Sequence, residues 1–251
     1  MFSFKVNMPS ITYTTHKIRK KSGKTRTITA PNSYLKSCQR EIMIHLNSFP
    51  LSDSAHGFVE KRSIVSNAIN HIQKKYVLNV DLKDFFPSIQ RDRVEDLFKE
   101  LEIPLQYVDL VVFNDVLPQG SPCSPVISNL MCRGMDKDME EYAKTLNLSY
   151  SRYADDMTFS GDNVSRDVID NIYSIIRTHN LVVNKEKTVV LGRHKRQIVT
   201  GLVVNEKVSI PKNTRRRIRA MKHQFETLTE YERQYLEGMN GVEQMVIKGA
   251  L

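Results

Sequence analysis

Residues 150–160 have the sequence Tyr150-Ser151-Arg152-Tyr153-Ala154-Asp155-Asp156-Met157-Thr158-Phe159-Ser160. Aromatic and β-branched residues on both sides of the two aspartates favour two strands joined by a tight turn. Two-residue hairpin turns prefer Asn-Gly or Asp-Gly, because their central residues need positive φ angles, and this stretch contains neither pair. A requirement other than turn formation therefore selects Asp155 and Asp156. Their adjacent negative charges repel each other, and a divalent cation relieves that repulsion.

A third carboxylate ends the short, mostly apolar segment Tyr76-Val77-Leu78-Asn79-Val80-Asp81-Leu82, whose pattern predicts a strand in the middle of a sheet. Paired strands lie about 4.8 Å apart, so Asp81 converges on Asp155 and Asp156 if this strand neighbours the hairpin. Three hard oxygen donors suit Mg²⁺. Two such ions, roughly 3.5 to 4 Å apart, activate a hydroxyl and stabilise a leaving pyrophosphate. A solvated turn is the alternative for an isolated Asp-Asp pair.

The composition favours a nucleic-acid partner. The chain has 37 basic and 28 acidic residues among 251, a formal charge of +9, although structural RNA-binding proteins share this property. Three cysteines without Cys-x-x-Cys spacing argue against a disulfide scaffold and a zinc knuckle. No apolar run approaches the roughly 20 residues that cross a bilayer. Residues 1–10 lack the pattern of a signal peptide. We therefore expect a cytoplasmic protein without a membrane partner.

The remaining patterns mix α and β structure without a βαβ rhythm, which predicts an α+β fold with an antiparallel sheet covered by helices. A hairpin with a basic tip is expected over residues 11–29. Strands are expected at 188–191 and 197–204. Helices are expected over 32–47, 63–74, 91–117 with a break at Pro104, 125 to about 146, 164–180, and beyond Pro211, where Ile218, Met221, Phe225 and Leu228 mark one side.

From about Lys20 to Ile210, the order of the motifs resembles that of the reverse transcriptases. The Tyr-Ala-Asp-Asp hairpin follows both the strand that ends in Asp81 and the loop Pro118-Gln119-Gly120-Ser121-Pro122. The resemblance implies a right-hand polymerase fold in one domain, 1–251, with an antiparallel-sheet palm and a short helical thumb. Its parts are expected at about 1–75 and 91–117 for the fingers, 76–90 and 118–205 for the palm, and 206–251 for a partial thumb. Family members commonly continue with further thumb helices.

The resemblance also implies the roles of individual residues. Asp81, Asp155 and Asp156 are expected to be catalytic and, with the carbonyl of Leu82, to bind two Mg²⁺ ions, for which Mn²⁺ is a substitute. Five residues are expected to bind the nucleotide: Arg26 at the triphosphate, Phe86 as a steric gate against a ribose 2′-hydroxyl, Gln119 at the sugar or template base, Gly120 at a close backbone approach, and Lys187 at the departing pyrophosphate. Phe85 is expected to be an ordinary core residue.

Two short elements resemble those of bacterial retron reverse transcriptases: Asn67-Ala68-Ile69-Asn70-His71 and Val199-Thr200-Gly201. They imply that RNA or primer is bound by Asn67, His71, Thr200 and Gly201. Asn67 and His71 also stand four apart on one helix face, so a local hydrogen-bonded pair that supports the fold is the alternative. Residues 212–222 hold six cations and no acid, and Arg215, Arg216 and Arg219 are expected to grip phosphates along a duplex.

The implied function is to copy part of a structured noncoding RNA into RNA-linked single-stranded DNA (msDNA) from deoxynucleoside triphosphates. A separate effector protein and a role in antiphage defence are part of the same expectation. One alternative is a group II intron-like or other defence-associated reverse transcriptase. Another is a catalytically inactive polymerase-fold RNA-binding module, against which the three intact aspartates argue. A metal-dependent nuclease is a remoter alternative. Such an enzyme would not need the loop Pro118-Gln119-Gly120-Ser121-Pro122, which resembles the nucleotide pocket of the reverse transcriptases.

Overall fold

The computed structural model describes residues 11–19, 23 and 25–249 of the chain. The chain divides into two compact units, each built from two segments that are distant in sequence. The first unit comprises Met1–Ser52 and Lys83–Gly134, and the second comprises Asp53–Leu82 and Met135–Leu251. The expected limits of fingers, palm and thumb stay a prediction.

The first unit combines a hairpin with short helices. The expected hairpin is confirmed: β1 (Tyr13–Arg19) pairs antiparallel with β2 (Thr25–Pro31), while most of its basic tip lies outside the described residues. Asn32 caps the first helix by accepting a hydrogen bond from the Leu35 N–H at 2.9 Å. The helical elements of this unit are α1 (Ser33–Leu46), α3 (Arg91–Glu100), η1 (Leu105–Tyr107), α4 (Val108–Val111) and α5 (Ser124–Met131).

Two helix predictions in residues 91–146 are wrong in their extent. Helical structure stops at Val111, because Phe113 and Val116 pair with each other across Asn114 and Asp115, which both have positive φ angles. The helix expected to run from residue 125 to about 146 is two helices, α5 and α6 (Arg133–Thr145), with the break at Cys132.

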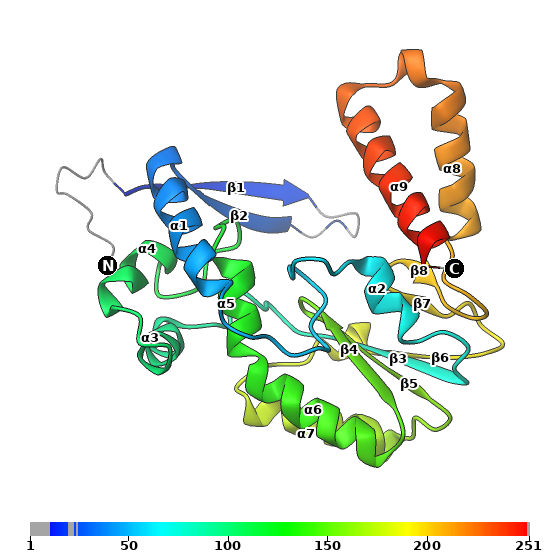
Figure 1. The fold of residues 1–251 in the computed structure, drawn as a ribbon, viewed down its shortest axis with the longest axis horizontal. Coiled ribbons are helices and arrows are strands. Elements are labelled where there is room, and N and C mark those ends of the chain that lie inside the picture. Colours follow the sequence, from blue (N-terminus) through cyan, green and yellow to red (C-terminus); the bar gives the residue numbers. More distant parts are fainter. Residues whose placement is uncertain (1–10, 20–22, 24, 250–251) are drawn as a thin grey trace. The chain divides into compact units, whose positions relative to one another are not determined.

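The second unit is built on a four-stranded antiparallel sheet with the strand order β4-β5-β3-β6, which confirms the expected sheet class. Figure 1 shows α6 and α7 on one face of this sheet and α2 on the other. The predicted helix over 63–74 is shorter than expected. The elements are α2 (Ile64–Ile69), β3 (Tyr76–Asp81), β4 (Ser149–Tyr153), β5 (Asp156–Gly161), α7 (Arg166–Thr178), η2 (Lys185–Lys187) and β6 (Val189–Gly192).

The predicted strand over 197–204 is a two-residue hairpin, β7 (Ile198–Val199) and β8 (Leu202–Val203), folded at Thr200-Gly201. Two helices follow, α8 (Lys212–His223) and α9 (Glu230–Lys248), linked by η3 (Phe225–Thr227). Of the expected apolar side, Ile218 and Met221 are buried, in a core shared with Leu236 of α9, but Phe225 is 45% exposed because α8 has already ended. No helix in the described ranges is both long and apolar enough to cross a bilayer.

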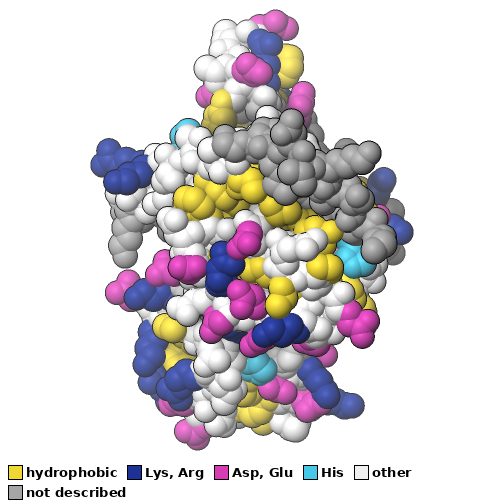
Figure 2. Space-filling view, turned by 90° about the vertical axis from the view of Figure 1, so that its left-hand side faces the viewer, with side chains coloured by type: hydrophobic (Ala, Val, Ile, Leu, Met, Phe, Trp, Pro, Cys, Tyr) yellow, Lys and Arg dark blue, Asp and Glu magenta, His cyan; other side chains and the backbone are white. Residues whose placement is uncertain are grey.

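The charge of the molecule is unevenly distributed along the chain. Residues 212–222 alone carry six of the 37 basic residues and no acid. Figure 2 shows one face of the molecule, on which Lys and Arg side chains alternate with Asp and Glu side chains.

Candidate active site

Strand pairing brings the three aspartates to one edge of the sheet. β3 runs antiparallel to β5, and in this register Asp81 stands opposite Asp156. Asp155 lies in the turn between β4 and β5, and its carbonyl accepts a hydrogen bond from the Leu82 N–H at 3.0 Å. The turn uses Ala154 at φ 58°, a left-handed conformation that costs an alanine about 1 kcal/mol or more. The condition set by the sequence is met: the strand that ends in Asp81 neighbours the hairpin.

Asp81 is held in place by residues in and just before η2. The Lys187 ammonium lies 2.7 Å from Asp81 Oδ1, and the Asn184 side chain donates to Oδ2 at 3.1 Å. The Asn184 N–H also donates to the Asp81 carbonyl at 2.8 Å. Desolvation opposes the charged form of Lys187, but the hydrogen bond to Asp81 and the charges of the three aspartates outweigh it and raise its pKa. Lys187 therefore stays protonated, and Asn184 holds the Asp81 side chain and backbone in place, a role that the sequence motifs did not single out.

The carboxyl group of Asp156 has a raised pKa. Part of the residue is exposed, yet enough protein surrounds the carboxylate for desolvation to be the largest cause that raises its pKa to about 6. The charges of Asp155 and Asp81 raise this pKa further, and Lys187 opposes them. Ionised Asp156 is thus kept in an unfavourable environment that a cation would relieve.

The donor set fits a hard divalent cation. Three carboxylates at one sheet edge repel each other, as the raised pKa of Asp156 shows, and carboxylate oxygens are the ligands that such cations prefer. Within the described residues, no three His, Cys, Asp or Glu side chains already have the arrangement of a formed metal centre. Lys187 instead supplies the positive charge next to Asp81.

We expect Asp156→Asn to be more stable than the parent protein at about pH 8, by on the order of 1 kcal/mol after allowance for solvent screening. A carboxyl group whose folded-state pKa is raised contributes stability that is fully present below its unfolded value, 3.8, and is lost as the pH rises through about 6. Asparagine removes that loss. Denaturant unfolding at several pH values measures the difference, which should vanish near pH 4. Asp162→Asn, at an exposed position after β5, controls for the loss of one charge. A pH-independent difference would contradict this prediction.

A buried ion pair lies under the hairpin turn. Arg152 of β4 and Asp136 of α6 have side chains that are 0% and 1% exposed, and they form two hydrogen bonds, at 2.6 Å and 2.8 Å. Tyr150 OH donates to the same carboxylate at 2.8 Å, and Arg152 Nη1 donates to the Ala154 carbonyl at 3.1 Å. Arg152 thereby links α6 to the turn that carries Asp155. The motif series did not reveal this pair, although an arginine within a strand of otherwise uncharged residues is a signal for it.

The segment before α2 supports the same turn from another side. Arg152 N–H donates to the Ser54 carbonyl at 2.8 Å, and His56 N–H donates to the Arg152 carbonyl at 2.7 Å. A Cβ atom on Gly57 would lie 2.4 Å from the Ala154 nitrogen, so only glycine allows this approach. The sequence patterns left residues 53–62 without an assigned structure.

Asn67 and His71, for which RNA contacts were predicted, do not lie at the surface. Both residues are 0% exposed. The two ring nitrogens of His71 bond to Ser160 of β5 at 2.6 Å and to Ser151 of β4 at 2.7 Å, and burial is the main cause that lowers its pKa to about 3. The alternative interpretation, a hydrogen-bonded pair of Asn67 with His71, is absent too, because among the described residues the Asn67 amide has no hydrogen-bond partner. His71 instead joins both strands of the hairpin.

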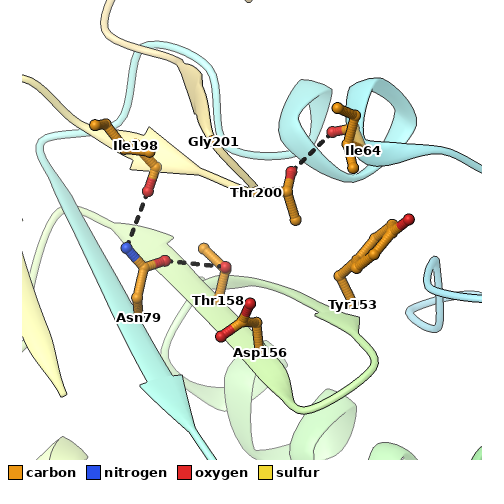
Figure 3. Close-up of a pocket in the computed structure, with 8 residues that line it drawn as sticks. All are labelled: Ile64, Asn79, Tyr153, Asp156, Thr158, Ile198, Thr200 and Gly201. Atoms are coloured by element: carbon orange, nitrogen blue, oxygen red, sulfur yellow. Dashed lines mark hydrogen bonds between the residues drawn. The ribbon is translucent and has the colours of Figure 1, made fainter. Parts of the chain in front are cut away.

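A cavity of about 340 Å³ opens beside Asp156. Figure 3 shows the Asp156 carboxylate directed into it, between Tyr153 and Thr158, with Thr200 on the opposite side. Thr200 and Gly201 have φ angles of 46° and 83°, and the Thr200 hydroxyl donates to the Ile64 carbonyl at 2.9 Å. A β-branched residue in the left-handed region is strained, and such strain concentrates at functional sites. These two predicted primer-binding residues therefore share a cavity with a predicted catalytic one.

In the first unit, the predicted nucleotide-binding residues lie around β2. Arg26 is exposed on β2, and the Gln119 carbonyl accepts a hydrogen bond from the Thr29 N–H at 2.7 Å. Gly120 has φ +134°, and a Cβ atom there would lie 2.7 Å from the Thr29 oxygen, so packing against β2 already requires glycine at this position. The expectation that Gly120 serves nucleotide approach stays a prediction.

Phe86 and Gln39 of the first unit also concern the predicted nucleotide pocket. Phe85 is 4% exposed, which confirms it as core, and Phe86 beside it is half-buried, with ring centroids 5.5 Å apart. Gln39, which no motif included, anchors the loop after Gly120 because its Oε1 accepts a hydrogen bond from Ser121 at 2.9 Å.

The arginines of α8 are not equivalent. Arg217 stacks over the Tyr235 ring of α9, 4.7 Å from its centroid, and so ties the two helices together. Arg215, Arg216 and Arg219 are exposed. These three are also the residues for which phosphate contacts were predicted.

Known proteins are similar to this chain in sequence and in fold. A family model described as "Reverse transcriptase (RNA-dependent DNA polymerase)" matches residues 18–230. The chain is 38% identical over 209 residues to the Retron Ec86 reverse transcriptase of Escherichia coli, covering 79% of this chain and 64% of that protein. It is 30% identical over 264 residues to the Retron Ec83 reverse transcriptase of Escherichia coli, covering 93% and 82% respectively.

A solved structure of telomerase from Candida albicans, in complex with the TWJ fragment of telomeric RNA, matches with a TM-score of 0.57 at 13% identity, over 88% of this chain and 52% of that one. This likeness confirms the predicted right-hand polymerase fold. The chain spans less than two thirds of the length of the Ec86 enzyme, 64%. With the ordered motifs and the converging aspartates, these matches show that the chain belongs to the reverse transcriptase family, among the retron reverse transcriptases of bacteria.

Proposed function

We propose that the protein is an RNA-directed DNA polymerase of retron type, which copies a structured noncoding RNA into RNA-linked single-stranded DNA from deoxynucleoside triphosphates. The observation that carries the proposal is the convergence of Asp81, Asp155 and Asp156 at one sheet edge, in a chain of this family. In this proposal the fingers, palm and thumb follow the limits expected from the sequence.

Asp81, Asp155, Asp156 and the Leu82 carbonyl are the groups that would hold two Mg²⁺ ions, with Mn²⁺ as a substitute. Such ions, when bound, activate the attacking hydroxyl and stabilise the leaving pyrophosphate. Lys187 contributes a positive charge that is retained at neutral pH, because its pKa is raised. We assign Lys187 to the leaving pyrophosphate, and Asn184 to holding Asp81 in place when Lys187 turns away from it.

The cavity beside Asp156 is the proposed place for the terminal nucleotide of the primer. Its volume, about 340 Å³, lies at the lower end of the range of small-ligand sites, roughly 300 to 1,000 Å³. Thr200 and Gly201 would contact the primer backbone opposite Asp156, so that its reactive hydroxyl faces the carboxylates.

Phe86→Ala is expected to lower the preference for deoxynucleotides over ribonucleotides by about 10- to 100-fold, since a hydrophobic clash against one hydroxyl gives discrimination of that order. The measurement is the ratio of kcat/KM for the two nucleotide types on a primed RNA. Phe85→Ala is the matched control: because Phe85 is 4% exposed, it should cost about 3 to 5 kcal/mol of stability and leave the ratio unchanged. An unchanged ratio for Phe86→Ala would remove the steric-gate assignment.

The proposed function is tested by purifying the protein with the RNA it retains, sequencing that RNA, and adding deoxynucleoside triphosphates with and without Mg²⁺. DNA synthesis that requires Mg²⁺ and stays linked to the RNA supports it. Synthesis on added primed RNA without any self-templated, RNA-linked product would favour a group II intron-like or other defence-associated enzyme. RNA retention without synthesis would favour the inactive binding module.

The proposal includes a separate effector protein and a role in antiphage defence, which the resemblance to retron enzymes implies. Cells that express the protein with its neighbouring genes should resist phage infection. Asp155→Asn in the same cells should abolish that resistance while protein levels stay equal. Unchanged resistance would reject the defence role and leave the polymerase proposal intact.

A further inference from the structure

The positive charge of the chain is concentrated in two places. One is residues 212–222 with six cations. The other consists of three turns, residues 73–76, 192–197 and 204–207, which together hold six lysines and arginines against one glutamate. The rest of the chain has 25 basic and 27 acidic residues, from totals of 37 and 28, and is therefore close to neutral. We call the three turns the basic platform.

Hydrogen bonds join the three turns of the platform into one rigid structure. Gln197 is 0% exposed, and its side-chain nitrogen lies 3.0 Å from the Lys74 carbonyl and 3.2 Å from the Lys75 carbonyl. The Asn205 side chain donates to the carbonyls of Arg193 and Lys195, at 3.1 Å and 2.8 Å, and accepts from the Gln197 N–H at 2.9 Å. All three turns are thus fixed relative to one another within the second unit.

The platform presents its cations to solvent. Lys75, Arg193, Lys195, Arg196 and Lys207 are exposed, while Lys74 is half-buried. The one acid, Glu206, pairs with Arg193 at 3.1 Å. Fixed cations without matching acids repel one another, and this repulsion is relieved when a polyanion binds. The exposed side chains of the platform are mostly long and charged. They can bind phosphates, whereas the stacking of unpaired bases requires aromatic side chains.

The platform lies away from the three aspartates. β3 begins at Tyr76, next to Lys75, and ends at Asp81, so the two sites stand at opposite ends of one strand, about 17 Å apart along it. Tyr76 also pairs with Gly192, the first residue of the second turn. The part of a nucleic acid that binds the platform is therefore not the part that would react at Asp156.

We infer that the basic platform is a second RNA-binding surface, which holds the phosphate backbone of a base-paired segment of the RNA while another part of that RNA is copied. The inference rests on the proposed function, which supplies a structured RNA as partner. A-form duplexes are recognised through backbone and shape, which suits a rigid surface of cations. The platform would thus select structured over unstructured RNA and leave the chemistry unchanged.

The test compares two triple variants with equal loss of charge. Lys195→Gln, Arg196→Gln and Lys207→Gln remove three exposed platform cations, and Lys137→Gln, Lys144→Gln and Arg177→Gln remove three exposed cations from α6 and α7. The probe is an RNA stem of about 20 base pairs, longer than the roughly 16 that a double-stranded RNA-binding domain spans. The platform variant should bind it at least about 10-fold more weakly at moderate salt, with a salt slope lower by about 3. The control variant should bind like the parent.

The outcomes separate the inference from the proposed function. Both triple variants should extend a short primed RNA at the parental rate, because neither changes the site around Asp156. Equal binding losses in both variants, or no loss in either, would overturn the inference while synthesis continued. If the platform variant lost binding to vesicles of anionic phospholipid but kept the RNA stem, the surface would be a membrane site and the inference would be wrong.

Discussion

Asp155→Asn is expected to lower Mg²⁺-dependent DNA synthesis by about 10³-fold or more, while the fold stays intact. Asparagine keeps the size of the side chain and removes its charge, so a metal ligand is weakened without a change in packing. A bound metal ion stabilises the transition state by several kcal/mol, and a loss of about 4 kcal/mol corresponds to a thousand-fold lower rate. The same reasoning applies to Asp81 and Asp156, which share the sheet edge. The measurement is the rate of single-nucleotide incorporation on a primed RNA in a single turnover.

Asp162→Asn is the matched control for that loss of activity. It removes one negative charge at an exposed position directly after β5, which begins at Asp156 and ends at Gly161. Its rate should stay within about threefold of the parent, since surface charges of this kind have small effects. RNA binding by Asp155→Asn should persist, which separates lost catalysis from lost binding. Synthesis by Asp155→Asn near the parental rate would show that the metal assignment is wrong.

Asp136→Asn is expected to destabilise the protein by about 3 to 5 kcal/mol, because it leaves the Arg152 charge buried without its partner. The Arg152 side chain is 0% exposed, and it donates hydrogen bonds to both Asp136 carboxylate oxygens and to the Ala154 carbonyl. The expected loss corresponds to a fall in Tm of roughly 10 °C for a chain of this size. Denaturant unfolding followed by circular dichroism measures it. Because Arg152 also holds the Ala154 carbonyl, the incorporation rate should fall even at temperatures where the variant is folded.

Two further variants decide whether this loss belongs to the buried pair. Arg166→Ala breaks the exposed pair with Asp170, whose side chains are 79% and 53% exposed, and should cost no more than about 0.5 kcal/mol. The double variant Asp136→Leu with Arg152→Met removes both charges and should be more stable than either single variant. If Asp136→Asn proved as mild as Arg166→Ala, the pair would not support the hairpin.

Local patterns were sufficient to predict the strands around the three aspartates. The aromatic and β-branched residues around Asp155 and Asp156, and the apolar run that ends at Asp81, predicted all three strands correctly, because such side chains favour extended backbone inside a sheet. Element ends were less predictable: α2 stops at Ile69, and the β7-β8 hairpin bends at two positive φ angles, one of them at a threonine. Tertiary contacts override local propensity at such places.

The sequence by itself determined the sheet class, the family motifs and the places of three aspartates, one at the end of an apolar strand and two in a hairpin, which converge if that strand neighbours the hairpin. Only the tertiary structure decided what surrounds them: Lys187 reaches Asp81 across 106 positions, Asp136 neutralises Arg152, and His71 is buried between Ser151 and Ser160. The physical reason is that propensity and periodicity act over a few residues. Which charges meet, and how far they are desolvated, depends on strand register and burial, which exist only once distant segments pack together.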